Sequence, residues 1–420
     1  MTRMKESGID WIGQIPEEWE VAKVNHIFEE HKQKNRGNKE KNLLSLSYGR
    51  IIRKSIDSSF GLLPESFDTY NIIQRGDIVL RLTDLQNDKR SLRVGLAREN
   101  GIITSAYLTL RLKNLESNDS YMYYLLHTYD ICKVFYNFGG GVRQGGTWSD
   151  IYKMELLIPP CNEQQKIADY LDKKIAQLDR AKRLLEKQIQ KLKDYRASLI
   201  YETVTKGLDK TVPMKDSGID WIGQVPEGWK IGRVKDAFKL RSEKNFRPIE
   251  EVQLLSLYTE FGVFPHGDRE EKGNKAVSTE GYKIVYKKDI VVNIILAWMG
   301  SIGISEYDGV TSPAYDIYEP LEGVCSKFFH YLFRTEAFAG QCYKYGKGIM
   351  KMRWRTYSDD FKTIEILIPD YNSQVNIVKF LDNKLKIINQ LIDIKQEQIE
   401  NINKQRQTLI YDYVTGKRRV

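Results

Sequence analysis

The sequence predicts an α+β protein in which two globular domains stand in tandem, as a pseudo-symmetric repeat, and each is followed by a long helix. Three observations predict this architecture. The chain repeats itself at a fixed offset, each half contains short apolar runs of strand length, and each half ends in a sustained heptad pattern. That heptad pattern is typical of a coiled coil. With 420 residues, the chain can bury two or three ordinary domain cores.

The repeat is clearest at the ends of the two halves. Met4–Val21 and Met214–Ile231 share 13 identities in 18 positions at an offset of 210 residues. The segments "LIPPCNEQQKIADYLDKK" from Leu157 and "LIPDYNSQVNIVKFLDNK" from Leu367 are related by the same offset, as are "LIYETVT" and "LIYDYVT". The offset drifts to 212 and 207 in the middle segments. The two halves kept their end segments and diverged in their middle segments. This pattern favours a common scaffold whose two copies recognise two different targets.

Short apolar runs bounded by Gly, Pro or Asp predict the strands. The clearest runs are Asp77–Leu82, Leu108–Leu112, Met154–Ile158 and Ile364–Ile368. Prolines at Pro159, Pro160 and Pro369 then end the last strand of each half. Asn162 and Asn372 follow as expected helix N-caps, since an asparagine side chain accepts hydrogen bonds from first-turn N–H groups. The expected segments are a domain at 1–160, a helix at 161–207, a domain at 208–370 and a helix at 371–416.

The long helices carry a seam whose residues are spaced alternately three and four apart. The positions expected in the helix–helix contact are Leu178, Leu185, Ile189, Leu192, Ile388, Ile392, Ile399 and Ile402. Lys182 interrupts the first helix where the second has Ile392, and Lys395 interrupts the second where the first has Leu185. Pairing within one chain can avoid the like charges that two copies would bring together, so we expect an intramolecular coiled coil. The alternative is that each helix packs separately on its own domain.

Charge and cysteine content limit the class of protein. Lys and Arg number 65 against 56 Asp and Glu, and the net charge of +9 can by itself be ordinary solubility charge. No run approaches the roughly 18 apolar residues of a membrane helix, and the N-terminus lacks the apolar core of a signal peptide. The four cysteines form no C-x-x-C pair. Free thiols in a reducing compartment are the simplest interpretation, so we expect a cytoplasmic protein.

Two basic segments and their counterparts predict the binding surface. Arg81–Arg98 has five basic and two acidic residues, and Gln341–Thr356 has five basic residues and no acidic one. Their counterparts are Asn293–Ser305 and the glycine-rich Asn137–Trp148. Lys and Arg neutralise phosphates, whereas Arg, Gln and Ser can hydrogen-bond base edges. The expected DNA-binding residues are Lys89, Arg90, Arg93, Arg143 and Gln144 in the first domain and Ser301, Lys347, Lys351, Arg353 and Arg355 in the second. The alternative for each segment is a merely solvated charged loop.

No catalytic or metal-binding pattern stands out. The chain has no G-x-x-x-x-G-K-[ST] phosphate loop, no H-E-x-x-H and no Asn-Pro-Pro-aromatic methyltransferase motif. A small nuclease site made of scattered carboxylates and a lysine leaves no such pattern and stays an alternative. The expectation is a DNA-binding protein without catalytic or metal-ligating residues.

The chain resembles the specificity (S) subunit of type I restriction–modification enzymes along its whole length. The resemblance rests on the tandem halves, "SGIDWIGQIPEEW", the junction "IPPCNEQQKIADYLDKK" and the terminal "LIYETVT". It implies two target recognition domains that each read half of a split DNA site, and two spacer helices that pack antiparallel. It also implies no catalytic activity. Two methyltransferase (M) and two restriction (R) subunits are the implied partners, and adenosylmethionine, ATP and magnesium belong to those partners.

The repeated tryptophans have two interpretations. Trp11, Trp19, Trp221 and Trp229 are candidates for a surface on which methyltransferase subunits dock, or they form local cores that pin each domain's first segment. Two rival functions also remain at this point. The chain can be a stand-alone protein-binding scaffold, or an autonomous DNA methyltransferase or nuclease. Binding of a labelled duplex by the purified chain, with and without a methyltransferase partner, distinguishes these possibilities.

Overall fold

The structure is a computed structural model that describes residues 3–54, 66–85, 88, 91–114, 117–138, 145–259, 261–268, 278–349 and 354–420. The chain forms two units. Unit 1 combines Met1–Glu186 with Gln396–Val420, and unit 2 is Lys187–Lys395. Each unit therefore holds one globular part, one portion of the first long helix and one portion of the second.

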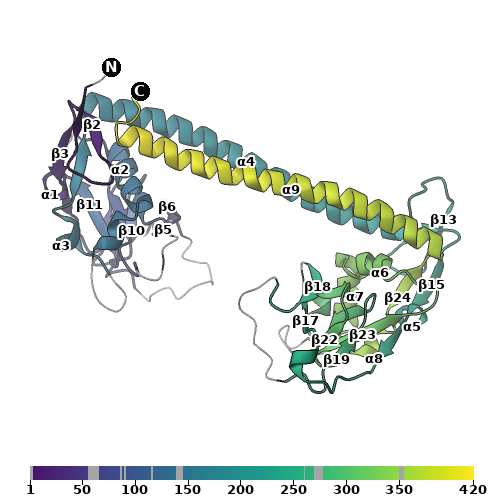
Figure 1. Cartoon of the computed structure of the whole chain (residues 1–420). Coiled ribbons are helices and arrows are strands. Elements are labelled where there is room, and N and C mark those ends of the chain that lie inside the picture. The colour runs from purple at the N-terminus through teal and green to yellow at the C-terminus, as the bar shows by residue number, and fades with distance from the viewer. Residues whose placement is uncertain are drawn as a thin grey trace. The chain divides into compact units, whose positions relative to one another are not determined.

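Unit 1 is built on a four-stranded antiparallel sheet with the order β4–β11–β8–β9. Strand β11 of this sheet is labelled in Figure 1. Its strands are β4 (Phe28–Glu30), β8 (Ile78–Leu80), β9 (Val94–Leu96) and β11 (Leu108–Leu112). The antiparallel pairs are β1 (Met4–Glu6) with β2 (Gln14–Pro16), β3 (Glu20–Lys23) with β12 (Glu155–Ile158), β5 (Leu44–Ser47) with β6 (Arg50–Arg53), and β7 (Asn71–Ile73) with β10 (Gly101–Ile103). The helices that begin here are α1 (Val24–Ile27), α2 (Asp119–Ile131), η1 (Val134–Asn137), α3 (Trp148–Ile151) and α4 (Cys161–Lys206).

Unit 2 contains a sheet of the same kind, with the order β16–β23–β20–β21. Its strands are β16 (Phe238–Arg241), β20 (Ile290–Asn293), β21 (Ile302–Ile304) and β23 (Tyr315–Pro320). The antiparallel pairs are β13 (Met214–Asp216) with β14 (Gln224–Pro226), β15 (Lys230–Arg233) with β24 (Glu365–Ile368), β17 (Leu255–Tyr258) with β18 (Gly262–Pro265), and β19 (Lys283–Val285) with β22 (Gly309–Thr311). The helices that begin here are α5 (Val234–Ala237), η2 (Ile249–Glu251), η3 (Ala297–Met299), α6 (Ser326–Phe333), α7 (Glu336–Tyr345), α8 (Ser358–Phe361) and α9 (Tyr371–Val414).

The two sheets confirm the predicted α+β class and the tandem repeat. The order of β16, β23, β20 and β21 repeats that of β4, β11, β8 and β9. The register of the last strand is repeated as well, because Leu157 pairs with Val21 and Leu367 pairs with Ile231, both shifted by 210 residues. The four apolar runs predicted as strands correspond to β8, β11, β12 and β24.

The core of unit 1 lies between the sheet, α2 and the long helices. Phe28, Leu80 and Leu110 of the sheet are buried together with Tyr121 and Leu125 of α2. The long helices complete this cluster with Leu171 and Ile175 of α4 and with Ile410 and Val414 of α9. Each fully buried side chain of this size contributes about 1.5–3 kcal/mol relative to exposure. Helix α2 is thus covered on both sides, and all its residues from Ser120 to Asp130 are buried.

Unit 2 repeats this arrangement with a more aromatic core. Phe238 of β16 packs against Phe329 and Phe333 of α6, with ring centroids 5.2 and 5.9 Å apart. The long helices again complete the cluster, here with Val204 of α4 and with Ile377 and Leu381 of α9. Both cores therefore depend on residues from the two long helices.

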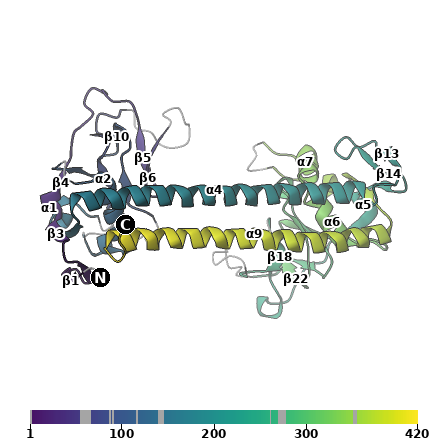
Figure 2. The ribbon, with the colours of Figure 1, turned by 90° about the horizontal axis from the view of Figure 1, so that it is seen from above.

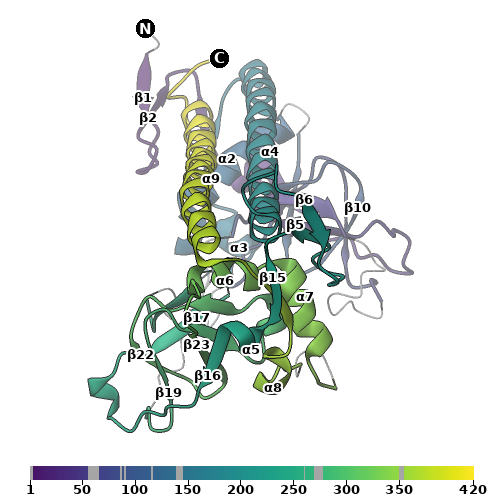
Figure 3. The ribbon, with the colours of Figure 1, turned by 90° about the vertical axis from the view of Figure 1, so that its right-hand side faces the viewer.

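The long helices pair in antiparallel fashion within each unit (Figures 2 and 3). In unit 1 the ring of Tyr170 lies 4.6 Å from that of Tyr413, and Asp179 lies 3.5 Å from Arg406. In unit 2 Lys395 donates to Gln188 over 2.7 Å, and Arg196 donates to Asn389 over 3.0 Å. Residue numbers rise along α4 as they fall along α9 in both sets. The predicted intramolecular antiparallel coiled coil is confirmed.

The expected seam residues are all buried or half-buried. Ile189, Ile388 and Ile399 are buried. Leu178, Leu185, Leu192, Ile392 and Ile402 are half-buried. The two lysine interruptions find polar neighbours. Lys395 donates to Gln188, and Lys182 lies 3.9 Å from Glu186 on its own helix.

The helix starts differ from the sequence prediction. Helices α4 and α9 begin at Cys161 and Tyr371, so Asn162 and Asn372 lie inside the first turn and the prediction that they are N-caps was wrong. At α9 the residue before the helix takes that role, because Asp370 accepts from the backbone N of Ser373 over 3.0 Å. The hydrogen bonds from Ser373 lower the pKa of the Asp370 carboxyl. This aspartate occupies the geometric position at which a side chain reaches the free first-turn N–H groups.

A glycine follows each long helix and contacts a Pro–Trp pair. Gly207 and Gly416 have positive φ angles of 75° and 72°, the conformation in which helices commonly end. A Cβ on Gly416 would lie 2.4 Å from Pro16, and one on Gly207 would lie 3.2 Å from the ring of Trp229. Trp19 in unit 1 is buried as well. In unit 1 the residues after this glycine bind the first segment of the chain, since Lys417 donates to the carbonyl oxygens of Ile12 and Gln14 over 2.8 and 2.7 Å.

Candidate nucleic-acid interface

Each unit brings its two predicted binding segments together. In unit 1 the backbone N of Gly146 donates to the carbonyl of Leu82 over 2.7 Å, which joins the β8–β9 connection to the glycine-rich segment. In unit 2 the backbone N of Thr356 donates to the carbonyl of Ile294 over 2.8 Å, which joins the β20–β21 connection to the basic segment. Both bonds link equivalent positions of the repeat. The structure therefore places one composite loop site at the same end of the sheet in each unit.

Six of the ten expected DNA-binding residues lie outside the described residues. They are Lys89, Arg90, Arg143, Gln144, Lys351 and Arg353. The other four are described, and they divide into two buried and two exposed side chains. Arg93 and Ser301 are fully buried, whereas Lys347 and Arg355 are exposed.

Arg93 is not a surface contact. Its guanidinium donates to the carbonyl oxygens of Arg81, Thr83 and Asp84 over 3.0, 2.8 and 3.3 Å, and also to that of Asp88. Its Nε donates to the Tyr136 hydroxyl over 3.1 Å. A buried cation is tolerated when its donors are occupied in this way. Arg93 thus ties together the described carbonyl oxygens of the segment before it, and the expectation that it touches DNA is corrected.

Asp130 closes the inner side of the same loop. Its carboxylate accepts from the backbone N of Arg93 over 2.6 Å. Burial raises the pKa of Asp130 to about 6, and the bond from Arg93 opposes that shift only in part. Among the described residues, its second carboxylate oxygen has no hydrogen-bond partner. The carboxyl is therefore costly to ionise in the folded protein.

Ser301 is also withdrawn from the surface. It follows Gly300, whose φ of 79° turns the chain after η3, and its backbone N donates to Leu296 over 3.1 Å. Its hydroxyl is buried and has no partner in the described parts of the chain. The β20–β21 connection is short and is joined by hydrogen bonds within itself, so the turn directs Ser301 toward the interior. The expectation that Ser301 reads DNA is corrected.

Lys347 and Arg355 stand at the base of the basic loop of unit 2. They form a backbone bridge with N···O distances of 2.9 and 3.0 Å. Lys347 also lies 2.9 Å from Asp360 and is 71% exposed. Trp354 stacks on Tyr343 with ring centroids 4.9 Å apart, and a Cβ on Gly346 would lie 2.4 Å from its indole nitrogen. The bridge and the stack hold the two ends of this loop together, so its basic residues stay candidates for phosphate contact.

The tryptophan clusters form parts of the local cores. Trp19 is fully buried, and its indole N–H donates to Glu163 over 3.0 Å. Trp229 is buried on the equivalent core. Trp11 and Trp221 are half-buried and pack on Tyr129 and Phe338 at 4.8 and 5.9 Å. These contacts favour the local-core interpretation over the docking one.

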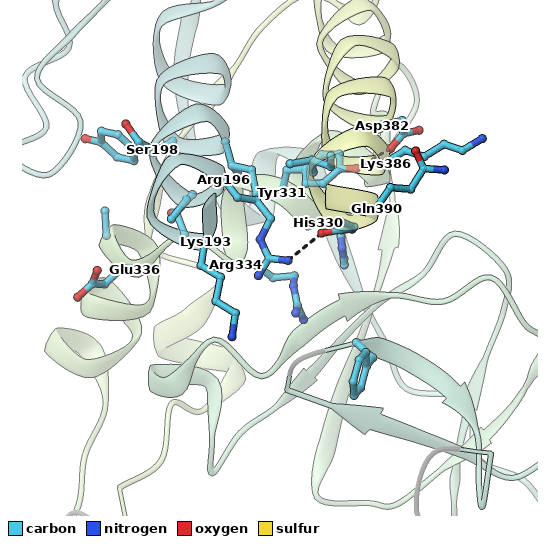
Figure 4. Close-up of a pocket in the computed structure, with 18 of the residues that line it drawn as sticks. Lys193, Arg196, Ser198, His330, Tyr331, Arg334, Glu336, Asp382, Lys386 and Gln390 are labelled. Atoms are coloured by element: carbon cyan, nitrogen blue, oxygen red, sulfur yellow. Dashed lines mark hydrogen bonds between the residues drawn. The ribbon is translucent and has the colours of Figure 1, made fainter. Parts of the chain in front are cut away.

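One group of polar residues in unit 2 did not stand out in the sequence. They line a cavity of about 1190 Å³ between α6 and the long helices (Figure 4). Lys193 and Arg196 come from α4, Arg334 follows α6, and Lys386 comes from α9. No motif joins them, because three separate elements supply them. The available signal was that Arg196 is a cation at a seam position.

Within the described ranges, no helix has an apolar stretch long enough to cross a membrane. In the same ranges, no three His, Cys, Asp or Glu side chains gather in a way that could hold a metal ion.

Comparison with known proteins gives consistent relatives. The family described as "Type I restriction modification DNA specificity domain" matches residues 16–193 and again residues 226–403. The MjaVIII specificity subunit of a type I restriction enzyme from Methanocaldococcus jannaschii is 24% identical, over 97% of this chain and 94% of its own length. The putative MjaX specificity subunit of the same organism is also 24% identical, over 97% and 96%.

Solved structures share the fold. A chain from a structural study of complex assembly and conformational transition in a type I R–M system matches with a TM-score of 0.67 and 14% identity, over 95% of this chain and 98% of that one. The HsdS subunit from Thermoanaerobacter tengcongensis matches with a TM-score of 0.52 and 14% identity, over 96% and 98%.

The two family matches coincide with the two copies of the repeat, and the curated relatives match over nearly their full lengths. The chain belongs to the type I restriction–modification DNA specificity family and is a specificity subunit, the non-catalytic member of such an enzyme.

Proposed function

We propose that each unit reads one half of a bipartite DNA site through its composite loop site. The observation that carries this proposal is the repeated placement of two diverged segments on one preserved frame. The Gly146–Leu82 and Thr356–Ile294 hydrogen bonds join equivalent positions, yet the loops that they join differ in length and side chains. A common frame with different contact residues is what recognition of two unlike half-sites requires. Base contacts give such a site its specificity, and phosphate contacts position it.

The paired helices are proposed to set the distance between the two half-sites and to dock methyltransferase subunits. Helix α4 has 46 residues and α9 has 44, which correspond to about 69 and 66 Å at 1.5 Å per residue. The entry segments and helix junctions occur twice, so they offer two equivalent docking surfaces for two identical subunits. Restriction subunits then join through the assembled complex, and adenosylmethionine, ATP and magnesium bind to the partners. The match to a chain from a study of type I complex assembly supports such partners.

Exchange of loops tests the reading of half-sites. Replacing Gln341–Thr356 by the corresponding loop of another specificity subunit should change one half of the methylated sequence and leave the other half and the gap unchanged. Methylome sequencing of a host that carries each variant measures this directly. An unchanged methylated sequence would show that the loops were assigned wrongly. A purified M–S complex that binds a labelled duplex equally well at about 50 and 200 mM salt would contradict DNA binding through phosphates.

A helix insertion tests the spacing. Four residues inserted at matching places near Lys187 and Glu397 add about 6 Å of helix. At roughly 3.4 Å per base pair, the preferred gap should lengthen by one or two base pairs, with both half-sites unchanged. Four residues are also a stutter, so the coiled coil unwinds locally and keeps its seam. Altered half-site bases with an unaltered gap would show that the helices do not set the spacing.

A further inference from the structure

The β5–β6 hairpin of unit 1 ends in a tight turn that holds a tyrosine in an unusual backbone conformation. Ser47 pairs with Arg50, so Tyr48 and Gly49 form a two-residue loop, and their φ angles are 47° and 74°. Two positive φ angles are typical of a type I′ turn, which favours Asn-Gly because bulky side chains fit the left-handed region poorly. The Tyr123 hydroxyl fixes this turn by donating to the Gly49 carbonyl over 3.1 Å. The chain therefore keeps a residue here that the turn itself disfavours.

The packing of the Tyr48 ring does not account for this choice. The residue is 86% exposed, and within the described part of the chain its ring contacts no other aromatic ring and no cation. A bulky residue kept at positive φ without packing of its ring indicates a role outside the fold. The corresponding hairpin of unit 2 repeats the feature, since Phe261 between β17 and β18 is 53% exposed. An exposed aromatic residue thus stands at the same hairpin in both units.

The hairpin lies against the edge strand that follows the basic segment of unit 1. A Cβ on Gly95 of β9 would lie 2.6 Å from the side chain of Leu46 and 2.9 Å from that of Ile51. Strand β9 begins directly after Arg93, whose guanidinium binds the carbonyl oxygens of the segment before it. The hairpin and the composite loop site therefore meet at the same strand.

The turn borders a cavity of about 670 Å³, which Tyr48 lines together with residues of α2 and the two long helices. Arg50 of β6 and Arg406 of α9 both pair with the carboxylate of Asp179 on α4, the second arginine at 3.5 Å. Within the described residues, each guanidinium makes one hydrogen bond, to this carboxylate, although arginine has five donors. Two cations that share one carboxylate leave a net positive charge, and the carboxylate holds them close together.

The other charged groups that line the cavity do not cancel this charge. Lys182 and Glu186 lie 3.9 Å apart on α4 and neutralise each other. Arg183 is exposed, and no carboxylate of the described residues lies within salt-bridge distance of it. His127 is neutral near pH 7, because burial and the nearby Arg406 lower its pKa to about 4, and its buried Nδ1 has no hydrogen-bond partner among the described residues. The cavity therefore carries more positive than negative charge.

We propose that this cavity receives a phosphate of the DNA backbone, held by Arg50 and Arg406, while the Tyr48 ring packs against the neighbouring sugar and base edge. This inference rests on the proposed DNA-reading function and adds a sequence-independent contact by the hairpin. A phosphodiester supplies the negative charge that the two guanidinium groups lack, and arginine binds it through two parallel N–H groups. The exposed ring beside a basic cavity favours a nucleic acid over an acidic protein segment, because bases offer flat apolar surface close to each phosphate.

The first test measures the salt dependence of DNA binding by the assembled M–S complex. The probe is a fluorescent duplex of mixed sequence, titrated between about 50 and 200 mM salt. Arg50→Gln should lower the slope of log affinity against log salt by about one, because one phosphate contact is lost. Arg53→Gln is the matched control on the same strand. The Arg53 guanidinium is already bound to Glu99 over 2.9 and 2.8 Å, so this change should leave the slope unaltered.

The second test separates the ring from the charge. Tyr48→Asn creates the Asn-Gly pair that this turn prefers, so the hairpin should be retained. Affinity for the duplex should fall by about tenfold at every salt concentration, with the slope unchanged, because the apolar area of the ring is no longer buried. Tyr48→Phe keeps the ring and should bind like the parent. Methylome sequencing should show the parent sequence for all these variants, since the contact serves every DNA sequence.

The outcomes separate this inference from the proposed function. A parent-like slope for Arg50→Gln would overturn the phosphate contact, and parent-like affinity for Tyr48→Asn would overturn the contact by the ring, while the DNA-reading function stands in both cases. Failure of Arg50→Gln to assemble with methyltransferase subunits, measured by native mass spectrometry, would assign the cavity to an acidic segment of that partner and overturn the inference. A parent complex that does not bind the duplex at all would overturn both proposals.

Discussion

Units 1 and 2 satisfy the backbone hydrogen-bonding groups of one equivalent loop in different ways. In both units the connection after the third strand of the sheet must satisfy its own backbone carbonyls, because buried polar groups are rarely left unpaired. Unit 1 has the longer connection, between Leu80 and Val94, and a buried arginine fills its centre. Unit 2 has the shorter one, between Asn293 and Ile302, and it closes through η3 and the Asn293 amide. The shared sheet is compatible with either way of hydrogen-bonding this loop, so the length of the loop can differ between the two units.

The difference shows how a duplicated frame can diverge. A short loop organised by its own backbone needs only an asparagine and a glycine with positive φ. A long loop needs a side chain that reaches several carbonyls at once, and arginine has five donors in a fixed fork. Each of the following predictions tests whether the two units are as independent as this comparison implies.

The largest effect is expected from Arg93→Met. The change removes the donors to four carbonyl oxygens, so it should cost roughly 3–5 kcal/mol of unfolding free energy in unit 1. Hydrogen exchange read by mass spectrometry should show faster exchange in β8 and β9 and no change in β20 and β21. The matched change Asn293→Ala should cost only about 1 kcal/mol, in unit 2. Exchange that accelerates in both units after either change would contradict their independence.

A smaller effect, with a defined pH window, is expected from Asp130→Asn. The folded pKa of Asp130 is raised to about 6, so the acid favours folding below its unfolded pKa of 3.8 and this contribution is lost as pH rises through 6. The asparagine variant keeps the acceptor for the Arg93 N–H and has no charge to bury. It should be more stable than the parent above pH 6, by up to about 3 kcal/mol, and equal to it near pH 4.

Thermal melting of both proteins between about pH 4 and 7 measures this difference. The exposed Asp10→Asn provides the control and should melt like the parent throughout. A difference between parent and Asp130→Asn that stays constant with pH would show that the carboxyl is ionised in the folded unit already at low pH.

The smallest effect is expected from Gly346→Ala in unit 2. Its Cβ would lie 2.4 Å from the Trp354 indole nitrogen, so the ring must shift and lose its 3.0 Å bond to the Tyr343 carbonyl. A cost of about 1–2 kcal/mol is expected, confined to the base of the basic loop. Gly340→Ala lies inside α7, and its Cβ would meet no atom within 4 Å beyond its chain neighbours and the nearby backbone of its own helix, so this change should instead be neutral or stabilising. Methylome sequencing should show relaxed choice at one half-site for Gly346→Ala only.

Sequence patterns predicted the frame well because the frame is repetitive. The 210-residue offset, the heptad spacing and the proline-terminated strands each correspond to a local rule, and the structure confirms the α+β class, the repeat and the coiled coil. Of the ten expected DNA-binding residues, six lie outside the described residues and two of the other four are buried. Nothing in the local pattern separates an arginine that binds its own loop from one that faces solvent, so Arg93 was assigned to DNA. The N-caps were predicted at Asn162 and Asn372, two residues after the positions that precede the helices, because helix boundaries are the least reliable part of such predictions.

The cavity of unit 2 was beyond the reach of the sequence. Lys193, Arg334 and Lys386 are far apart in the chain and meet only through tertiary packing. Comparison of the two copies held one usable signal, since Asp179 aligns with Asn389 at the 210-residue offset. That difference has meaning only once Arg406 and Arg196 are known to lie opposite these positions.

Unit 1 is built from two separate segments of the chain, and this has a consequence for its folding during synthesis on the ribosome. Its core needs Ile410, Tyr413 and Val414, and Lys417 ties down the first segment of the chain. These residues are translated after everything else in the unit, whereas Lys187–Lys395 is contiguous. Domains fold as units during translation, so the second unit can close while the first still waits for its final helix turns. Of the two units, the one that begins to leave the ribosome first is therefore the one that finishes folding last.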